Sequence, residues 1–237
     1  MPGKTALNRA LSKLGILSRA QSTEAIRAGR VRVNGAVVRD PLHLVVPERA
    51  RIVIDGAVRR SAPWRTLAFH KPRGVVTTRR DPEGRRTVFD VLGSAGAGLV
   101  AVGRLDFAST GLLILTTDTQ LANWIADPAN AVPRVYVVTV RGDVTRELAA
   151  TLPAARAEVR KASARESHLV VELIRGRNRE IRRMFEAVGH EVTRLKRVRI
   201  GGLELGSLEP GRWREVTRDE IRRSFPGCDR RRARPTT

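Results

Sequence analysis

One segment of the sequence combines residue types that could do covalent chemistry with a layout that would expose them. Residues 103–115 read Gly-Arg-Leu-Asp-Phe-Ala-Ser-Thr-Gly-Leu-Leu-Ile-Leu, so a short polar loop lies between two apolar runs. This layout predicts Asp106 on a loop beside a buried sheet, where a carboxylate is partly desolvated and a neighbouring guanidinium keeps it ionised. Such a carboxylate can act as a nucleophile. An Arg-x-Asp pair at a strand end is also commonly a structural ion pair, so both interpretations remain open from the residues alone.

The composition indicates a polyanionic partner. The 237 residues include 45 Lys+Arg against 24 Asp+Glu, which gives a formal net charge of +21. An imbalance of this size favours a nucleic-acid partner. Only five of the basic residues are lysine, and guanidinium groups match phosphate oxygens and stack on bases better than ammonium groups do. A GC-rich genome would account for much of the preference for arginine, but not for the surplus over acids.

Other classes of protein are disfavoured by what the sequence lacks. Its single cysteine, Cys228, excludes an intrachain disulfide and fits a reducing compartment. The four histidines show no metal-ligand spacing, and no Gly-rich phosphate loop ends in Lys-Ser/Thr, so we expect no metal and no cofactor. No apolar run approaches the roughly 20 residues of a membrane helix, and no signal-peptide core is evident. We therefore expect a cytoplasmic protein without membrane contact.

The first sixty residues predict a compact basic module. Leucines at helical spacing predict an amphipathic helix within residues 5–18 that ends at Gly15, and a capping-box pattern at 18–21 predicts a second helix that stops at Gly29. Two short strands then flank an Asn34-Gly35 turn. We place this module at residues 5–60, although an N-terminal extension of one larger domain remains an alternative. The basic residues at its edges are Lys13, Arg19, Arg27, Arg30 and Arg32.

The remainder of the chain predicts a second, larger domain at residues 64–222. A polar stretch interrupted by proline at 59–63 is typical of a linker. Beyond it, apolar runs alternate with glycine, proline and helical segments, which indicates an α+β arrangement with a mixed sheet. The helix after Asn178 carries an apolar stripe. Its members are Ile181, Met184, Phe185 and Val188. Residues 228–237 are rich in arginine, and we expect them to form a disordered basic tail.

The segment around Asp106 resembles the signature Gly-Arg-Leu-Asp-x-x-Thr-x-Gly-Leu-Leu of pseudouridine synthases. Further motifs in the same order resemble the RsuA/RluB branch of that family, and the N-terminal module is similar to the S-four-type RNA-binding domain. These further motifs are His-Lys-Pro-Arg-Gly-Val-Val-Thr at 70–77, Thr-Val-Phe-Asp-Val-Leu at 87–92, the segment 176–190, and Leu195-Lys196-Arg197. The resemblance spans roughly residues 7–220. It implies a small N-terminal alpha-L RNA-binding module followed by a pseudouridine synthase catalytic domain with a mixed, largely antiparallel sheet.

The resemblance also implies roles for individual residues. Asp106 would attack the target nucleoside, at the sugar or at the base. Tyr136 would pack on the flipped-out base and assist proton transfer from C5, although by its pattern alone it is a strand aromatic that fills the core. Arg182 would pair with Asp106 and keep it ionised. Arg104 would support the loop or a flipped-out phosphate.

The expected partner is a structured ribosomal RNA or a ribosomal assembly intermediate, and a monomer would suffice. Large-subunit RNA is favoured because the segments at 71–74 and 176–179 look more like RluB than RsuA. The alternatives are small-subunit RNA, a non-catalytic RNA-binding or ribosome-assembly factor, and a basic DNA-binding protein. Besides the basic edge of the N-terminal module, the expected RNA contacts are Lys71, Arg73, Arg177, Arg179 and Arg183; a solvated helix face is the alternative for the last two.

Overall fold

The computed structural model of the chain describes residues 4–14, 16–17, 19–47, 49–58, 63–177 and 179–228. Several features predicted from the sequence involve residues outside these ranges. The helix end at Gly15, the capping Ser18, most of the linker at 59–63 and nearly all of the tail at 228–237 lie outside the described residues. The same holds for the side chain of Lys13, whose expected RNA contact therefore stays a prediction.

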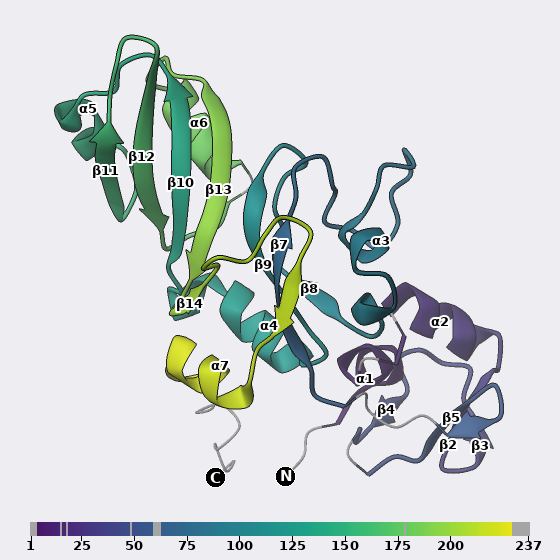
Figure 1. Cartoon of the computed structure of the whole chain (residues 1–237). Helices are drawn as coiled ribbons and strands as arrows, with labels where there is room; N and C mark the ends of the chain where they lie inside the picture. Colours follow the sequence, from purple (N-terminus) through teal and green to yellow (C-terminus); the bar gives the residue numbers. More distant parts are fainter. Residues whose placement is uncertain are drawn as a thin grey trace.

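Two short helices pack on small sheets at the N-terminal end of the chain, at the lower right of Figure 1. The strand pair β1–β4 lies beside a four-stranded sheet of order β3-β2-β5-β6. The bounds are β1 Thr5–Ala6, α1 Leu7–Lys13, α2 Arg19–Arg27, β2 Val31–Val33, β3 Ala36–Val37, β4 Leu44–Val45, β5 Ile52–Ile54 and β6 Ala57–Val58. The first helix begins at Leu7 rather than Thr5, because Thr5 and Ala6 pair with β4.

The predicted turns and apolar faces of this module are confirmed. Asn34 and Gly35 have φ values of 52° and 92°, as a tight two-residue hairpin turn requires, and Asn34-Gly35 joins the antiparallel strands β2 and β3. Leu7 and Leu11 of the first helix and Ala25 and Ile26 of the second are fully buried in one core. These helices are short, so we attribute their stability to this shared core rather than to helix propensity.

The rest of the molecule is built on a nine-stranded sheet. Seven strands lie side by side in the order β11-β12-β10-β13-β9-β7-β15, and the other two pair at the side of this path, β14 with β13 and β8 with β9. Its strands are β7 Thr66–Lys71, β8 Val100–Val102, β9 Thr110–Thr116, β10 Arg134–Arg141, β11 Arg156–Lys161, β12 Glu166–Leu173, β13 Val192–Ile200, β14 Leu203–Glu204 and β15 Trp213–Glu215. All of these pairings are antiparallel except that of β13 with β9. The predicted mixed, largely antiparallel sheet is confirmed.

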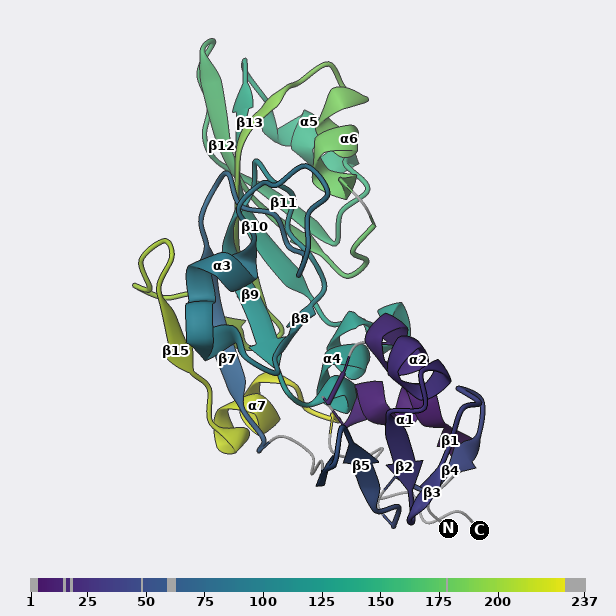
Figure 2. The same cartoon turned by 90° about the vertical axis from the view of Figure 1, so that its right-hand side faces the viewer.

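Helices cover the sheet differently on the two sides of the β13–β9 pairing (Figures 1 and 2). Helices α5 and α6 pack against one face of β10, β12 and β13, whereas β7 and β9 are buried on both faces, by α4 and α7 on one side and α3 on the other. The predicted stripe of α6 is confirmed, because Ile181, Met184 and Phe185 are buried and Val188 packs beside them. The bounds are α3 Val88–Leu92, α4 Thr119–Ala126, α5 Arg146–Thr151, α6 Glu180–Glu186 and α7 Arg218–Ser224.

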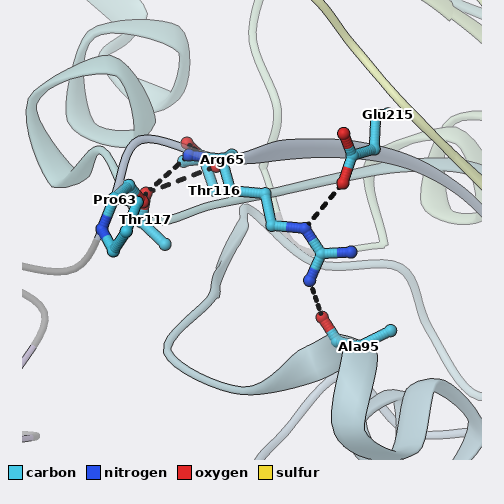
Figure 3. Close-up of polar contacts among 6 residues, drawn as sticks. All are labelled: Pro63, Arg65, Ala95, Thr116, Thr117 and Glu215. Atoms are coloured by element: carbon cyan, nitrogen blue, oxygen red, sulfur yellow. Dashed lines mark hydrogen bonds and ion pairs between the residues drawn. The ribbon is translucent and has the colours of Figure 1, made fainter.

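A network around Arg65 fixes the first residues of β7, as Figure 3 shows. The Arg65 guanidinium donates to the carbonyl oxygen of Ala95 at 2.8 Å and to Oε1 of Glu215 at 2.9 Å. The Thr117 hydroxyl accepts from the Arg65 backbone N–H and donates to the carbonyl oxygen of Pro63, both at 2.9 Å. These contacts join β7 to β9, to β15 and to the turn after α3.

The two halves of the sheet meet at a junction that requires glycine. β13 and β9 pair in parallel through Lys196 with Thr110 and Arg197 with Gly111. Gly111 has a φ of +114°, and a Cβ atom on it would lie 2.2 Å from the carbonyl oxygen of Arg197. Only glycine permits so close an approach of two backbones. The loop that carries Asp106 ends directly before this junction.

Candidate active-site cavity

A cavity of about 550 Å³ opens where the two halves of the sheet meet. Its wall contains Asp106 from the loop between β8 and β9, Tyr136 from β10, and Arg197 from β13. The lining residues include six arginines but only two carboxylates, Asp106 and Glu180. The arginines are Arg104, Arg134, Arg175, Arg177, Arg179 and Arg197. A concave site with such an excess of positive charge favours an anionic ligand.

The loop of residues 103–109 is held by the segment that precedes it in the chain. The Thr77 hydroxyl forms hydrogen bonds with both backbone groups of Leu105. It donates to the carbonyl oxygen of Leu105 at 2.9 Å and accepts from the backbone N–H of Leu105 at 3.2 Å. Within the loop, the backbone N–H of Ser109 donates to the carbonyl oxygen of Asp106 at 3.0 Å. The Asp106 side chain is half-buried. These contacts confirm the predicted position of Asp106 on a loop beside a buried sheet.

Lys71 also holds this loop, and its place corrects the expectation that it contacts RNA. The side chain is fully buried, and its Nζ donates to the carbonyl oxygens of Ser109 at 2.8 Å and Pro72 at 2.9 Å. Burial lowers the pKa of Lys71 to about 8, while the charge of Asp106 opposes this shift and that of Arg197 adds to it. A buried ammonium bonded to carbonyl groups cannot meet a phosphate, so Lys71 positions the loop.

Tyr136 lies at the border between the core and the cavity. Its side chain is 8% exposed and belongs to the cluster that contains Leu105 of the loop and Leu195 of β13. It also lines the cavity. The two interpretations of this tyrosine from the sequence are therefore compatible, since one ring can pack on the core and present an edge or face to a ligand.

Arg182 does not form the direct ion pair with Asp106 that the resemblance implied. Its Nη1 donates to the carbonyl oxygen of Val192 at 2.7 Å, and its Nε and Nη2 are buried without a partner in the described part of the chain. Burial and the charge of Arg179 lower the pKa of Arg182, whereas the charge of Asp106 raises it. The two groups are thus within electrostatic range of each other but are not hydrogen-bonded.

Two buried arginines of the cavity wall were missed as site residues. Arg197 is 4% exposed; its Nε donates to the carbonyl oxygen of Leu112 at 2.8 Å, and its Nη1 makes a longer contact of 3.4 Å to that of Arg104. Arg134 is 9% exposed and donates to the carbonyl oxygens of Val132, Ile174 and Ile125. For Arg134 the available signal was an arginine between apolar residues, Pro133 and Val135; Arg197 follows Lys196 and carries no such signal, and the basic residues were interpreted as surface groups.

The other predicted RNA-contacting side chains are exposed, in two places. Arg104, Arg177 and Arg179 are exposed at the cavity, whereas Arg73 is exposed but does not line it. Arg183 is exposed on α6, but it does not line the cavity. Four further arginines are exposed on the N-terminal module, where Arg30 is paired with Asp55 at 3.4 Å. These four are Arg19, Arg27, Arg30 and Arg32.

The described residues contain neither a metal-binding cluster nor a helix that could span a membrane. Within residues 4–58 and 63–228, apart from the gaps given above, no three His, Cys, Asp or Glu side chains cluster so as to hold a metal ion. In the same part of the chain, no helix has the length and apolar character needed to cross a membrane.

Comparison with known proteins decides the family. Residues 65–187, which carry the Asp106 loop and Tyr136, match the RNA pseudouridylate synthase family, and residues 7–48 match the S4 domain. The chain belongs to the RNA pseudouridylate synthase family. This confirms the family that the sequence motifs indicated, and the S4 match covers α1, α2 and the strands β2 to β4.

Other members of this family match over most of the chain. It is 41% identical to the ribosomal large subunit pseudouridine synthase B of Pseudomonas aeruginosa over 93% of its own length, and it spans 62% of that relative. It is 35% identical to the protein of the same name in Bacillus subtilis, covering 92% of this chain and 94% of the relative. A crystal structure of a pseudouridylate synthase superposes with a TM-score of 0.63 at 28% identity, over 93% of this chain and 99% of that one.

The buried Lys71 leads to a prediction about stability and pH. Its pKa of about 8 in the folded protein lies below the ordinary value of 10.5, so between these pH values the unfolded chain holds a proton that the folded one has released. The free energy of unfolding should therefore rise with pH across this window, relative to Lys71→Met, by up to about 3 kcal/mol. Urea titrations of both proteins from pH 7.5 to 10.5 measure this difference. A constant or falling difference would contradict the burial of the ammonium.

Proposed function

We propose that the chain isomerises a specific uridine of large-subunit ribosomal RNA to pseudouridine, with Asp106 as the nucleophile. The observation that carries the proposal is the half-buried Asp106 on a braced loop that opens into a cavity rich in arginine. A volume of about 550 Å³ suits one nucleotide swung out of an RNA stack. The names of the relatives support the large ribosomal subunit as the source of the RNA, in preference to the small subunit.

The reaction needs no atom that the RNA does not already contain. Asp106 would attack the target nucleoside, at the sugar or at the base, and form a covalent adduct while the bond from C1′ to N1 breaks. The released uracil rotates within the cavity, and a new bond forms from C1′ to C5. If Asp106 attacked the sugar, the carboxylate leaves C1′ as this new bond forms; if it attacked the base, the carboxylate leaves the ring as C5 is deprotonated. On either route C5 loses its proton and N1 gains one. Because product and substrate are isomers, this scheme requires no redox partner or nucleotide.

The residues around Asp106 would divide the remaining tasks. Tyr136 would pack on the flipped-out uracil and assist removal of the C5 proton. Arg182 has N–H groups without a partner in the described structure and lies within the electrostatic range of Asp106, so a change of its side-chain conformation would allow it to hold the carboxylate ionised. Arg104, which is exposed at the cavity, would contact the phosphate beside the target.

The exposed arginines would supply most of the affinity for RNA. Phosphate contacts position a protein on its RNA, whereas the cavity inspects the base. We place the RNA-binding module at 5–60 and the catalytic domain at 64–222. The expectations that the protein is cytoplasmic, that it acts as a monomer, and that naked RNA or an assembly intermediate is its substrate remain predictions.

Asp106→Asn tests the proposed chemistry directly. The substitution keeps the size of the side chain but removes the nucleophile, so we expect the rate to fall by about 10⁴-fold or more. Release of tritium from a large-subunit ribosomal RNA transcript that carries [5-³H]uridine measures the rate, and filter binding measures affinity, which should stay within about threefold. Asp143→Asn is the control, because Asp143 is an exposed carboxylate outside the cavity wall and should be dispensable. Wild-type protein that binds the transcript but releases no tritium would indicate a binding or assembly factor.

The N-terminal module leads to a separate prediction about affinity. Arg19 and Arg27 are exposed at the two ends of α2, and each phosphate contact that an arginine makes releases counterions. Arg19→Gln with Arg27→Gln should weaken RNA binding and reduce the slope of log affinity against log salt by about 2, with the single-turnover rate at saturating enzyme unchanged. Glu24→Gln, at an exposed position of the same helix, is the matched control and should leave the slope unchanged or steeper. An unaltered slope in the double variant would exclude this face from RNA contact.

A further inference from the structure

Arg197 is a buried cation that no described carboxylate neutralises. Its side chain is 4% exposed, it lines the cavity beside Asp106, and no ion pair joins it to an acid in the described part of the chain. Its Nη2 is buried without a partner among the same residues. Burying a charge in this way is costly, and for packing alone an apolar side chain would be a better choice. The guanidinium at this position therefore calls for an explanation other than packing.

The contacts of Arg197 lie at the two ends of the Asp106 loop. Its Nη1 reaches the carbonyl oxygen of Arg104, at the start of the loop, and its Nε donates to that of Leu112, just beyond the end. The backbone of Arg197 also abuts Gly111, where a Cβ atom would lie 2.2 Å from its carbonyl oxygen. One residue of β13 thus contacts the chain on both sides of residues 105–110.

Arg134 provides a comparison within the same cavity. It is buried to a similar degree, and it likewise donates to backbone carbonyl oxygens. Its partners, however, are Ile125 at the end of α4, Val132, and Ile174 after β12, and none of them belongs to the Asp106 loop. Arg134 therefore braces one wall of the cavity, whereas Arg197 braces the loop that carries the nucleophile.

We infer that Arg197 is a positioning residue for the Asp106 carboxylate, an inference that rests on the proposed function. It acts through the backbone of the loop, by fixing the distance between the carbonyl groups of Arg104 and Leu112. The planar guanidinium contacts the two oxygens from two separate nitrogens, Nε and Nη1, a rigid arrangement that the single nitrogen of a lysine does not reproduce. Displacement of a reacting group by about 1 Å can reduce a rate about 100-fold, so the fork matters for catalysis and not only for stability.

Arg197→Lys and Arg197→Gln distinguish the effect of the forked guanidinium, with its two separate donors, from the effect of the positive charge. The lysine variant keeps the positive charge without the fork, and the glutamine variant keeps a polar donor without the charge. Arg214→Lys is the control: Arg214 binds Glu220 with two nitrogens at 3.0 and 2.6 Å, away from the cavity, so this change removes a comparable fork elsewhere. Two properties are measured well below each Tm: the single-turnover rate of tritium release from the ribosomal transcript, and hydrogen exchange of the backbone amides at 104–110.

The expected result is a rate lowered by about 10- to 100-fold in both Arg197 variants, with RNA affinity within about threefold of wild type. Amide exchange at 104–110 should be faster in these variants and unchanged in Arg214→Lys. A wild-type rate in Arg197→Lys would overturn the inference, since charge alone would then suffice. A loss of affinity that equals the loss of rate would also overturn it, because Arg197 would then bind RNA. If the wild-type protein releases no tritium, the proposed function is wrong. The amide exchange data still test whether Arg197 holds the loop of residues 104–110.

Discussion

The parallel pairing of β13 with β9 is the constraint on which the site depends. It consists of the register Lys196 to Thr110 and Arg197 to Gly111, and it joins two halves of a sheet whose other pairings are antiparallel. Because Gly111 has no side chain, the backbones approach closely, and the loop of residues 103–109 ends beside β13. The cavity between the halves brings together Asp106, Tyr136 and the arginines of its wall, which are far apart in the sequence.

Three buried cations with backbone partners either hold the loop of Asp106 or line the cavity. Lys71, Arg134 and Arg197 are each less than one-tenth exposed, and each donates to carbonyl oxygens. Carbonyl groups solvate these charges only in part, as the lowered pKa of Lys71 shows. The exposed arginines around the mouth have a different character, since water and phosphate can both reach them. The positive charge of the protein thus serves two purposes: internal groups hold the Asp106 loop or the cavity wall, and external groups are available for RNA.

Local pattern sufficed for the parts of the structure that depend on near neighbours in the chain. The hairpin at Asn34-Gly35, the stripe of α6 and the loop position of Asp106 follow from turn chemistry and periodicity, and the ordered motifs gave the family. Contacts between distant segments were not accessible in this way. Lys71 was expected to contact RNA, whereas its carbonyl partner is Ser109, 38 residues away in the sequence. The bond from Arg197 to Leu112 spans 85 residues, and no spacing in the sequence reveals it.

The most direct test of the account is made in cells. Pseudouridines in ribosomal RNA are mapped by carbodiimide-dependent reverse-transcription stops in a strain that lacks this protein, and in the same strain complemented with wild type or Asp106→Asn. If the chain has the proposed activity, one site in the large-subunit RNA disappears on deletion, returns with the wild-type protein, and stays absent with the variant. Persistence of every site in the deletion strain, or restoration by Asp106→Asn, would contradict it.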